Sequence, residues 1–385
     1  MANLLDEASI LLTPTAYNNG SMLAVKPENG DGDMTFSRNS AATRINAQGL
    51  VENVAINLPR IDYTDGCGNW LLEPQSTNLV PYSSDLTQGL SNRLLITSNV
   101  GTSPDGTNTA DKLIPNNTNS AYHYFAFSSL TIATNNVYSV FLKKAEYEYA
   151  LISFETNGLS ASSDKALINL NNGTIEQSDT ETKVEDYGNG WYRCSIKATS
   201  SRTSVVIYPL ASASLGSFTG DNVSGILAWG LQLEQNSYPT SYIPTTQGAI
   251  STRLADIANN SGNASLINSE EGVLYAEAKA SVHNGDITLS SGSNNDNLII
   301  RFNLNSGRID CNMKVAGAYQ FIFNYTTDMS INNKIAVRYK ANDFALFVNG
   351  TKVLTDISGI TPNANTFNEL NFSSANQASN FFYGK

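Results

Sequence analysis

Apolar residues occupy every second position in several short segments of this chain. The clearest apolar sets are Tyr138, Val140 and Leu142; Tyr192, Cys194 and Ile196; Leu227, Trp229, Leu231 and Leu233; and Ile335, Val337 and Tyr339. A two-residue period places alternate side chains on one face of a β-strand. The pattern therefore predicts strands that bury one face and expose the other.

Turn signals separate these segments. Asn349 and Gly350 lie between two apolar runs, and Asn-Gly favours a two-residue hairpin because both positions need positive φ. The Asn-Asn-Gly run at 171–173 gives a similar hairpin signal. Many short strands joined by turns are typical of β-sandwiches and jelly rolls. We therefore expect an all-β protein.

The spacing of these signals divides the chain into four parts. Residues 80–246 predict a first jelly-roll sandwich and residues 273–385 a second sandwich, with a linker at 247–272. Residues 1–79 are expected to form an N-terminal extended arm followed by a docking segment, which we define as residues 36–79.

The arm contains two short apolar runs, at 8–14 and 22–27, and each ends in proline. Runs of this length do not hold a core together by themselves. Two interpretations remain open: the runs add strands to a sheet edge in this chain, or they pair with a neighbouring chain.

The docking segment has little periodicity but holds a set of charged residues that stand out in a chain poor in charge. They are Arg38, Arg44 and Arg60, with Asp62 and Glu73 as the expected carboxylate partners. Arginine and carboxylate form geometrically fixed contacts, so these residues are expected to pin an irregular segment. Trp70 follows a glycine-rich turn and is expected to pack.

Composition supports a folded β protein and limits its partners. The chain has 385 residues, of which 41% are hydrophobic and only 15% are charged, and it contains 18 Tyr and 15 Phe. Aromatic residues favour β-strands. Surfaces that bind the phosphates of nucleic acids need clustered Lys and Arg. The net charge of −11 therefore argues against a nucleic-acid or anionic-membrane partner.

Cysteine usage predicts no disulfide framework. Cys67, Cys194 and Cys311 are odd in number and far apart, which also excludes zinc-ligand spacing. The N-terminal residues show no basic region followed by an apolar run, and no stretch approaches the length of a membrane helix. We therefore expect no signal peptide and no membrane insertion. Free thiols are consistent with a protein that is assembled in a cytosol.

Catalytic chemistry is not expected. The chain has two histidines, His123 and His283, which are too few for a multi-histidine metal site, and His123 is expected to be a surface or satisfied core residue. Glu146 and Glu148 are two residues apart and either share a strand face or form a solvated strand end. The acidic run at 176–186 has the wrong spacing for a pair of glycosidase carboxylates. Residues 29–33 form an incomplete calcium loop and are expected to be an acidic turn. We therefore expect no catalytic residue, metal site or cofactor.

Glycan binding without cleavage needs exposed aromatic rings with hydroxyl-binding groups nearby. The tyrosines that fit this role are Tyr122, Tyr124, Tyr147 and Tyr149. Packing in a core or an interface explains them equally well, so no residue is assigned to glycan binding.

Several short sequence motifs resemble those of a known family. The docking segment, most clearly residues 36–44, 59–63 and 71–79, is similar to the front end of tailed-bacteriophage virion proteins, particularly those of phages of Bacteroidetes hosts. Residues 231–245 resemble the last strand and exit of carbohydrate-binding-like jelly rolls in phage tail proteins. Residues 251–256 weakly repeat residues 42–44.

The C-terminal part resembles the laminin-G or concanavalin A-like fold, on the phrases at 272–277, 333–350 and 382–385. That family usually continues with one more strand and a short helix. Three interpretations of this additional strand remain open: the protein lacks it, a neighbouring chain supplies it, or it lies outside this sequence.

The resemblance implies a non-catalytic virion protein assembled in the host cytoplasm: a head fibre, a tail fibre or a decoration protein. Its implied partners are other virion proteins, copies of itself (most often a trimer) and a host-surface glycan. The alternative is a stand-alone glycan-binding or glucanase-like glycan-cleaving protein.

Overall fold

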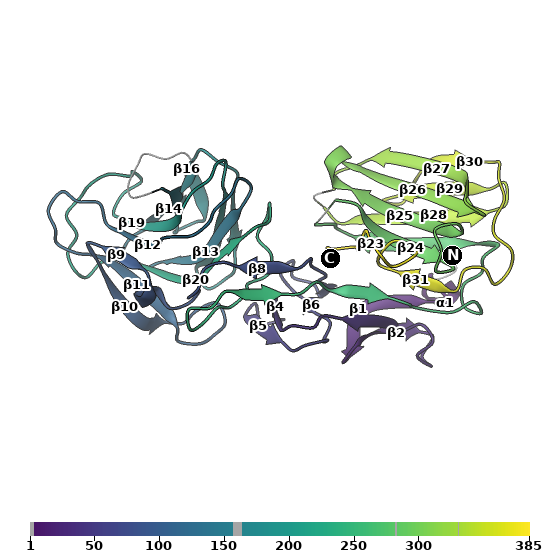
Figure 1. Ribbon diagram of the computed structural model, residues 1–385, viewed down its shortest axis with the longest axis horizontal. Helices are drawn as coiled ribbons and strands as arrows, with labels where there is room; N and C mark the ends of the chain where they lie inside the picture. The colour runs from purple at the N-terminus through teal and green to yellow at the C-terminus, as the bar shows by residue number, and fades with distance from the viewer. Residues whose placement is uncertain (1–3, 157–163, 282, 330) are drawn as a thin grey trace. The chain divides into compact units, whose positions relative to one another are not determined.

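Nearly all regular structure in the chain is β-strand. A computed structural model describes residues 4–156, 164–281, 283–329 and 331–385 (Figure 1). In these residues the only α-helix is α1 (Leu4–Glu7), and it is too short to cross a membrane. The prediction of an all-β protein is confirmed.

The chain forms two compact units, and each is assembled from separate stretches. Unit 1 comprises residues 1–41, 54–74 and 254–385, and unit 2 comprises residues 42–53 and 75–253. The predicted arm and docking segment therefore do not form a separate part. The linker also divides, because β21 (Ser251–Arg253) belongs to unit 2 and β22 (Ile257–Asn259) to unit 1. The short strands of these regions complete sheets whose other strands lie far away in sequence.

Unit 2 is built on two six-stranded antiparallel sheets. The first sheet has the order β10 (Leu94–Gly101), β11 (Ala110–Pro115), β20 (Ile226–Glu234), β13 (Val137–Lys144), β18 (Trp191–Lys197) and β17 (Thr182–Asp186). The second has the order β16 (Thr174–Ser178), β15 (Lys165–Asn169), β14 (Tyr149–Glu155), β19 (Ser204–Leu210), β12 (Tyr124–Phe127) and β9 (Leu90–Asn92). Val140 and Phe154, one from each sheet, are fully buried in a shared core. The unit is therefore a β-sandwich.

Strand β20 differs from the predicted half-buried pattern, because both of its faces are buried. Ser139 pairs with Gln232 and Phe141 pairs with Trp229, so β20 carries one extra residue between these pairs. Gly230, at φ +65°, lies in this bulge. A bulge shifts the alternation by one residue. Trp229 thus packs on the outer face of the sheet, whereas Leu231 and Leu233 enter the core between the sheets.

Two short pairs of strands complete unit 2. β8 (Ser76–Asn78) pairs with β21 from far along the chain, and β4 (Ala42–Ile45) forms a hairpin with β5 (Val51–Val54). Val51 of this hairpin packs with Phe141 and Trp229. The hairpin of β4 and β5 thus covers the outer face of the first sheet, which explains why β20 is buried on both sides.

Unit 1 contains three larger sheets and one short pair of strands. The four-stranded sheet has the order β23 (Glu271–Ala278), β28 (Asn333–Lys340), β29 (Phe344–Val348) and β30 (Thr351–Asp356). The five-stranded sheet has the order β27 (Ala318–Thr326), β26 (Arg308–Val315), β25 (Asn297–Asn303), β24 (Gly285–Ser290) and β31 (Glu369–Asn371). The third sheet has the order β1 (Leu11–Asn18), β2 (Ser21–Lys26), β3 (Met34–Ser37) and β22; β6 (Ile61–Asp62) pairs with β7 (Asn69–Trp70).

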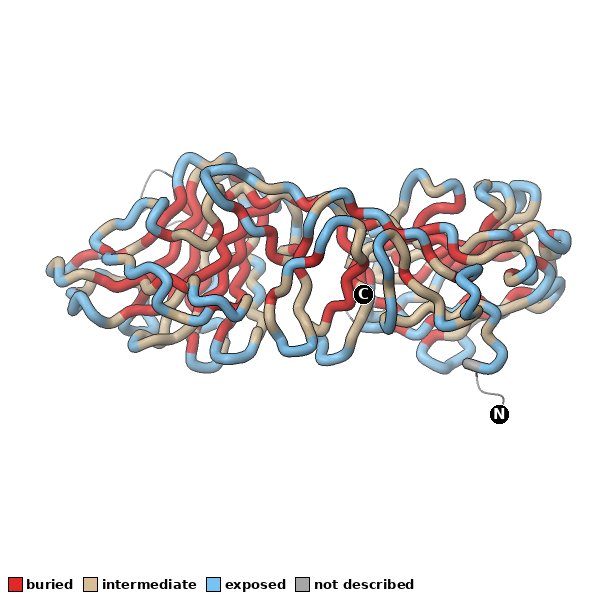
Figure 2. Tube along the Cα trace, turned by 90° about the horizontal axis from the view of Figure 1, so that it is seen from below, coloured by how far each residue is buried: buried red, intermediate tan, exposed pale blue. Residues whose placement is uncertain are grey.

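One hydrophobic core serves these sheets. Met22 and Phe36 of the third sheet are buried with Phe302 and Val337 of the other two. Figure 2 shows the buried residues as red stretches of the chain that alternate with pale blue exposed stretches. Two apolar runs of the predicted arm thus pair with each other and add strands to their own chain.

Proline does not end the first of these runs. Pro14 lies inside β1, which is an edge strand of its sheet. An edge position tolerates proline because one side of the strand has no sheet partner. The pairing of β1 with β2 is irregular between Leu12 and Tyr17, around Pro14.

Several local predictions are confirmed. Asn349 and Gly350 have φ of +50° and +83° and join β29 to β30. Residues 171–173 join β15 to β16 as a hairpin. In β28 the burial pattern alternates as predicted, with Val337 buried and Lys340 exposed.

Candidate functional site

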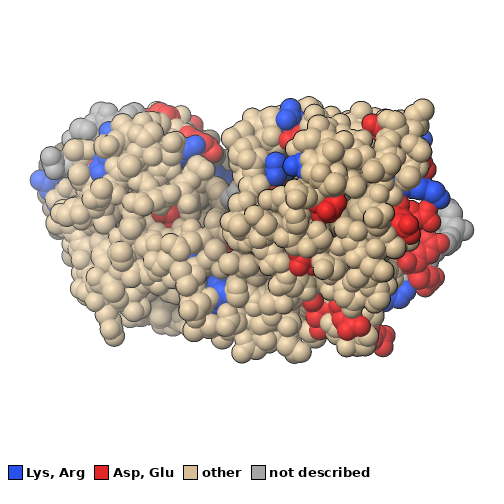
Figure 3. Space-filling model, turned by 45° about the vertical axis from the view of Figure 1, so that its right-hand side comes forward, with Lys and Arg blue, Asp and Glu red and all other residues tan. Residues whose placement is uncertain are grey.

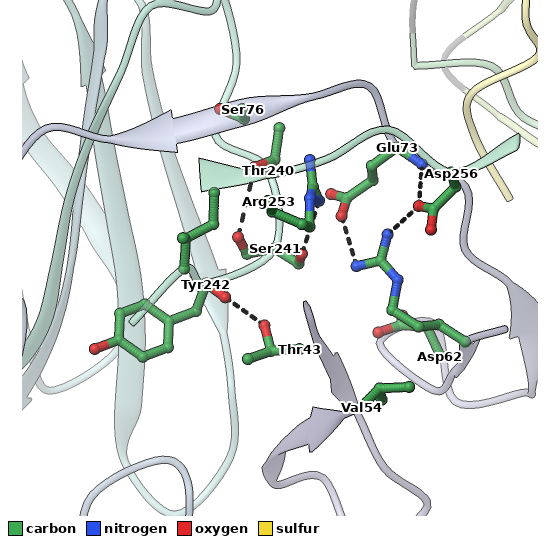
Figure 4. A network of polar contacts seen from close by, with 12 residues as sticks. Thr43, Val54, Asp62, Glu73, Ser76, Thr240, Ser241, Tyr242, Arg253 and Asp256 are labelled. Carbon is green, nitrogen blue, oxygen red and sulfur yellow. Dashed lines mark hydrogen bonds and ion pairs between the residues drawn. The ribbon is translucent and has the colours of Figure 1, made fainter. Parts of the chain in front are cut away.

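The arginines of the docking segment lead to a buried ionic cluster in unit 1. Arg60 Nη1 lies 2.7 Å from Glu73 Oε2, and Arg60 Nη2 lies 2.5 Å from Asp256 Oδ2. Figure 4 labels Glu73 and Asp256 of this group. Arg38 Nη1 lies 3.1 Å from the other oxygen of Asp256. We call Arg38, Arg60, Glu73 and Asp256 the arginine cluster. Asp256 connects its two guanidinium groups.

The cluster holds irregular backbone in place. The guanidinium of Arg38 also donates to the carbonyl oxygens of Ser40, Ala55 and Leu58 at 2.7 to 3.1 Å. Glu73 N–H donates to Asp256 Oδ2 at 2.8 Å. Two cations and two anions balance in a site from which water is excluded, so their charges stabilise each other.

Burial by itself would lower the pKa of Arg60, but Asp256 and Glu73 raise it above its ordinary value. The guanidinium therefore stays charged, and both carboxylates are engaged by it. This geometry fits the predicted pinning role. It does not resemble a general acid or base, which needs a carboxyl group that can exchange a proton with a substrate.

The sequence identified part of this cluster. Glu73 is confirmed as a partner of Arg60, and Arg44 pairs with Glu52 at 2.8 Å in unit 2. Asp62 forms an ion pair with Lys385, at 2.8 Å. Asp256 was missed, although it ends the 251–256 phrase that weakly repeats residues 42–44.

Unit 2 holds a second buried polar group, formed around Glu234. Its carboxylate accepts hydrogen bonds from Ser76 Oγ (2.6 Å), Thr240 Oγ1 (2.5 Å) and Gln232 Nε2 (2.7 Å). We call Ser76, Gln232, Glu234 and Thr240 the Glu234 cluster. Figure 4 also shows the Thr43 hydroxyl donating to the carbonyl of Tyr242, at 2.5 Å. These contacts join the docking segment to the strand and exit of residues 226–245.

The candidate glycan-binding tyrosines of unit 2 are mostly engaged in packing. Tyr124 and Tyr149 pack at the margin of a cluster on the outer face of the second sheet. Tyr147 has an edge contact with Phe218 at 6.0 Å. Of the four, Tyr122 is exposed, at 37%, and the other three are partly buried. The structure therefore favours packing for three of these tyrosines.

A buried tyrosine joins the same cluster. The rings of Tyr124 and Tyr208 lie 5.5 Å apart, and Tyr208 OH donates to Glu155 Oε1 at 3.4 Å. Burial, together with the negative charge of Glu155, raises the pKa of Tyr208 well above its ordinary value. Tyr208 therefore stays protonated and acts as a donor.

The acidic candidates are separated by their partners. Glu146 and Glu148 lie in the turn between β13 and β14, so the interpretation that they share a strand face is wrong. Glu146 pairs with Lys112 at 2.7 Å and Glu148 with Lys144 at 2.6 Å. In the run at 176–186, the carboxylates that form ion pairs also do so with different lysines. Each of these described carboxylates thus contacts a lysine of its own.

The histidines also have structural contacts. His123 is buried, and its Nδ1 and Nε2 lie 2.6 Å and 3.1 Å from the carbonyl oxygens of Arg93 and Phe218. His283 is exposed, and its Nδ1 accepts from Asn305 N–H at 3.4 Å. Over the described residues, no group of three or more His, Cys, Asp or Glu side chains is arranged to hold a metal ion.

The cysteines are all free thiols, as expected. Cys67 is exposed, whereas Cys194 and Cys311 are buried. Burial raises the pKa of both buried thiols well above the ordinary value, so they remain protonated and pack as small apolar groups.

Comparison with known proteins shows a distant likeness to solved structures. No protein-family model and no curated protein matches the sequence. Among solved structures, the chain is similar to mouse laminin alpha1 chain, domains LG4-5, with 11% identity over 69% of this chain and 84% of that chain. The TM-score is 0.23.

Proposed function

We propose that this chain is a structural protein of a tailed-bacteriophage particle, a head fibre, tail fibre or decoration protein that contributes to host attachment. The observation that carries the proposal is the composition of the arginine cluster. Arg38, Arg60 and Glu73 come from the docking segment, which is the part of the sequence most similar to such proteins. In the buried cluster these arginines and carboxylates stabilise one another, so the residues that carry the resemblance also hold this segment in place.

The finer fold assignment belongs to the same proposal. It takes unit 2 as a carbohydrate-binding-like jelly roll and unit 1 as a laminin-G or concanavalin A-like sandwich. The sequence phrases and the packed antiparallel sheets of each unit support it. The proposed partners are other virion proteins, copies of this chain in a homo-oligomer (a trimer is favoured) and a host-surface glycan.

The low charge of the surface supports a role in contacts with other molecules. Lys and Arg number 23 and Asp and Glu 34 among 385 residues, and most of the face seen in Figure 3 is uncharged. Uncharged polar surfaces suit contacts with sugars and with other subunits. The chain would perform no reaction, would be assembled in the host cytoplasm and would end in the particle.

The test combines location with oligomeric state. An antibody against this chain is used to probe purified phage particles, and the purified chain is examined by size-exclusion chromatography with light scattering. We expect the chain in particles and an oligomer in solution. A monomer absent from particles would overturn the proposal, and a reducing-sugar assay on host capsule would then separate glycan binding from cleavage.

A further inference from the structure

Two aromatic residues, one exposed and one half-buried, lie on the outer face of the four-stranded sheet in unit 1. Tyr275 of β23 is 50% exposed, and it lies directly opposite Ala336 of β28. Ala336 in turn pairs with the half-buried Phe347 of β29. Paired residues share a sheet face, so the three side chains form one row across three strands. We call Tyr275, Ala336 and Phe347 the aromatic row.

We propose that the aromatic row is a saccharide-binding site, an inference that rests on the host-attachment function proposed above. The small side chain of Ala336 leaves a low position between two aromatic residues. The outer strands of the row are about 9.5 Å apart, since neighbouring strands are spaced by about 4.8 Å. Aromatic ring faces carry partial negative charge and attract the C–H groups of a sugar ring.

Hydrogen-bonding groups surround the row. Tyr275 OH donates to Glu277 Oε2 at 3.3 Å, and Asn332 Nδ2 donates to Glu277 Oε1 at 3.1 Å. Lys352 pairs with Phe347 across the sheet and ends the row at β30. These carboxylate, amide and ammonium groups provide both acceptors and donors for sugar hydroxyls.

The charges of this face favour an uncharged ligand. Lys340 pairs with Glu271 at 2.6 Å, and Lys334 lies 3.8 Å from Glu277. Arg338, in the next row, pairs with Asp343. These cations are largely balanced by carboxylates, and the chain carries a net charge of −11, so a phosphate backbone is a poor fit.

The size of the apolar patch argues against a second copy as the occupant. Val273, 58% exposed, extends the patch along β23, and with the 50% exposed Tyr275 it gives an apolar area on the order of 200 Å², since a whole aromatic side chain has about 150–250 Å². The paired charges at Glu271 and Glu277 bound it at both ends. A stable protein interface buries about 800 Å² on each partner.

The experiment measures binding of the full chain to an array of immobilised neutral and acidic oligosaccharides, followed by titration calorimetry with the strongest neutral binder. Tyr275→Ala and Phe347→Ala are compared with Tyr319→Ala. Tyr319 is the matched control because it is 55% exposed and lies on β27 of the other large sheet. Ala336→Gln fills the low position without removing an aromatic residue, and it serves if either alanine variant fails to fold.

We expect a neutral glycan to bind, Tyr275→Ala and Phe347→Ala to weaken binding about tenfold or more, and Tyr319→Ala to leave it unchanged. Glycan binding that survives Tyr275→Ala, Phe347→Ala and Ala336→Gln would overturn the site but leave host attachment standing. No binding by the native chain to any glycan would remove both the site and glycan attachment. A changed oligomeric state in Tyr275→Ala, seen by light scattering, would show a subunit interface instead.

Discussion

The docking segment is held by charged groups in unit 1 and by neutral donors around one carboxylate in unit 2. In the arginine cluster, Arg60 contacts two carboxylates, and Asp256 contacts two arginines. In the Glu234 cluster, hydroxyl and amide groups donate to a single buried acid. Removing one member of a buried ion pair leaves an uncompensated charge, whereas removing one neutral donor leaves a smaller penalty. A single substitution is thus expected to lower the free energy of unfolding more in the arginine cluster than in the Glu234 cluster.

The largest effect is expected for Asp256→Ala. This change leaves Arg38 and Arg60 in a buried site with one carboxylate in place of two. We expect a loss of about 3–5 kcal/mol in the free energy of unfolding of unit 1, the typical cost of breaking a buried ion pair. Urea unfolding followed by tryptophan fluorescence measures it.

The units can be observed separately because Trp70 belongs to unit 1, whereas Trp191 and Trp229 belong to unit 2. A Trp70→Phe background reports on unit 2 alone and serves as the control. A loss below about 1 kcal/mol, in the range of surface pairs, would contradict the importance given to the arginine cluster.

An intermediate effect is expected for Glu234→Gln, which keeps the shape of the side chain. One carboxylate oxygen becomes an NH2 group that faces Ser76, Thr240 or Gln232 as another donor. We expect unit 2 to lose about 1–3 kcal/mol, the cost of a buried polar group without its partner. The Trp191 and Trp229 signal measures it, and a larger loss than for Asp256→Ala would reverse the comparison.

The smallest effect is expected for Arg44→Ala. Arg44 pairs with Glu52 at 2.8 Å, but 42% of the Glu52 side chain is exposed. Solvent screening limits such a pair to about 0–1 kcal/mol. A double-mutant cycle with Glu52→Ala isolates the coupling, and raising the salt concentration should reduce it further. A coupling above about 2 kcal/mol would mean that exposure is a poor guide here.

Local features of the fold could be predicted from sequence. Alternation in β28 and the Asn349-Gly350 turn depend on neighbouring residues, so a short window contains the needed information. The bulge at Gly230 does not, because its effect depends on pairing with β13 and on the cover over the outer sheet face. The alternation around β20 therefore predicted the strand but assigned Trp229 to the wrong face.

Long-range assignments were harder for the same reason. Asp256 is 196 positions after Arg60, and only the fold brings them together. Tyrosine-rich phrases near 122–124 and 147–149 suit a glycan surface or a packed cluster equally well by composition. The burial of these side chains in the folded protein distinguishes the two interpretations. Tyr275, which the sequence did not single out, is exposed on a sheet face.

The divided composition of unit 1 has a consequence during translation. Unit 2 has all of its residues once position 253 has left the ribosome, but residues 1–41 need partners from 254–385. At about 5–20 residues per second, these first residues wait on the order of ten seconds or more for β22 and the strands after it. During that interval Met22, Met34 and Phe36 have no core to enter. Nascent chains arrested just after residue 253 should therefore already contain a protease-resistant unit 2, with the N-terminal stretch still open to cleavage.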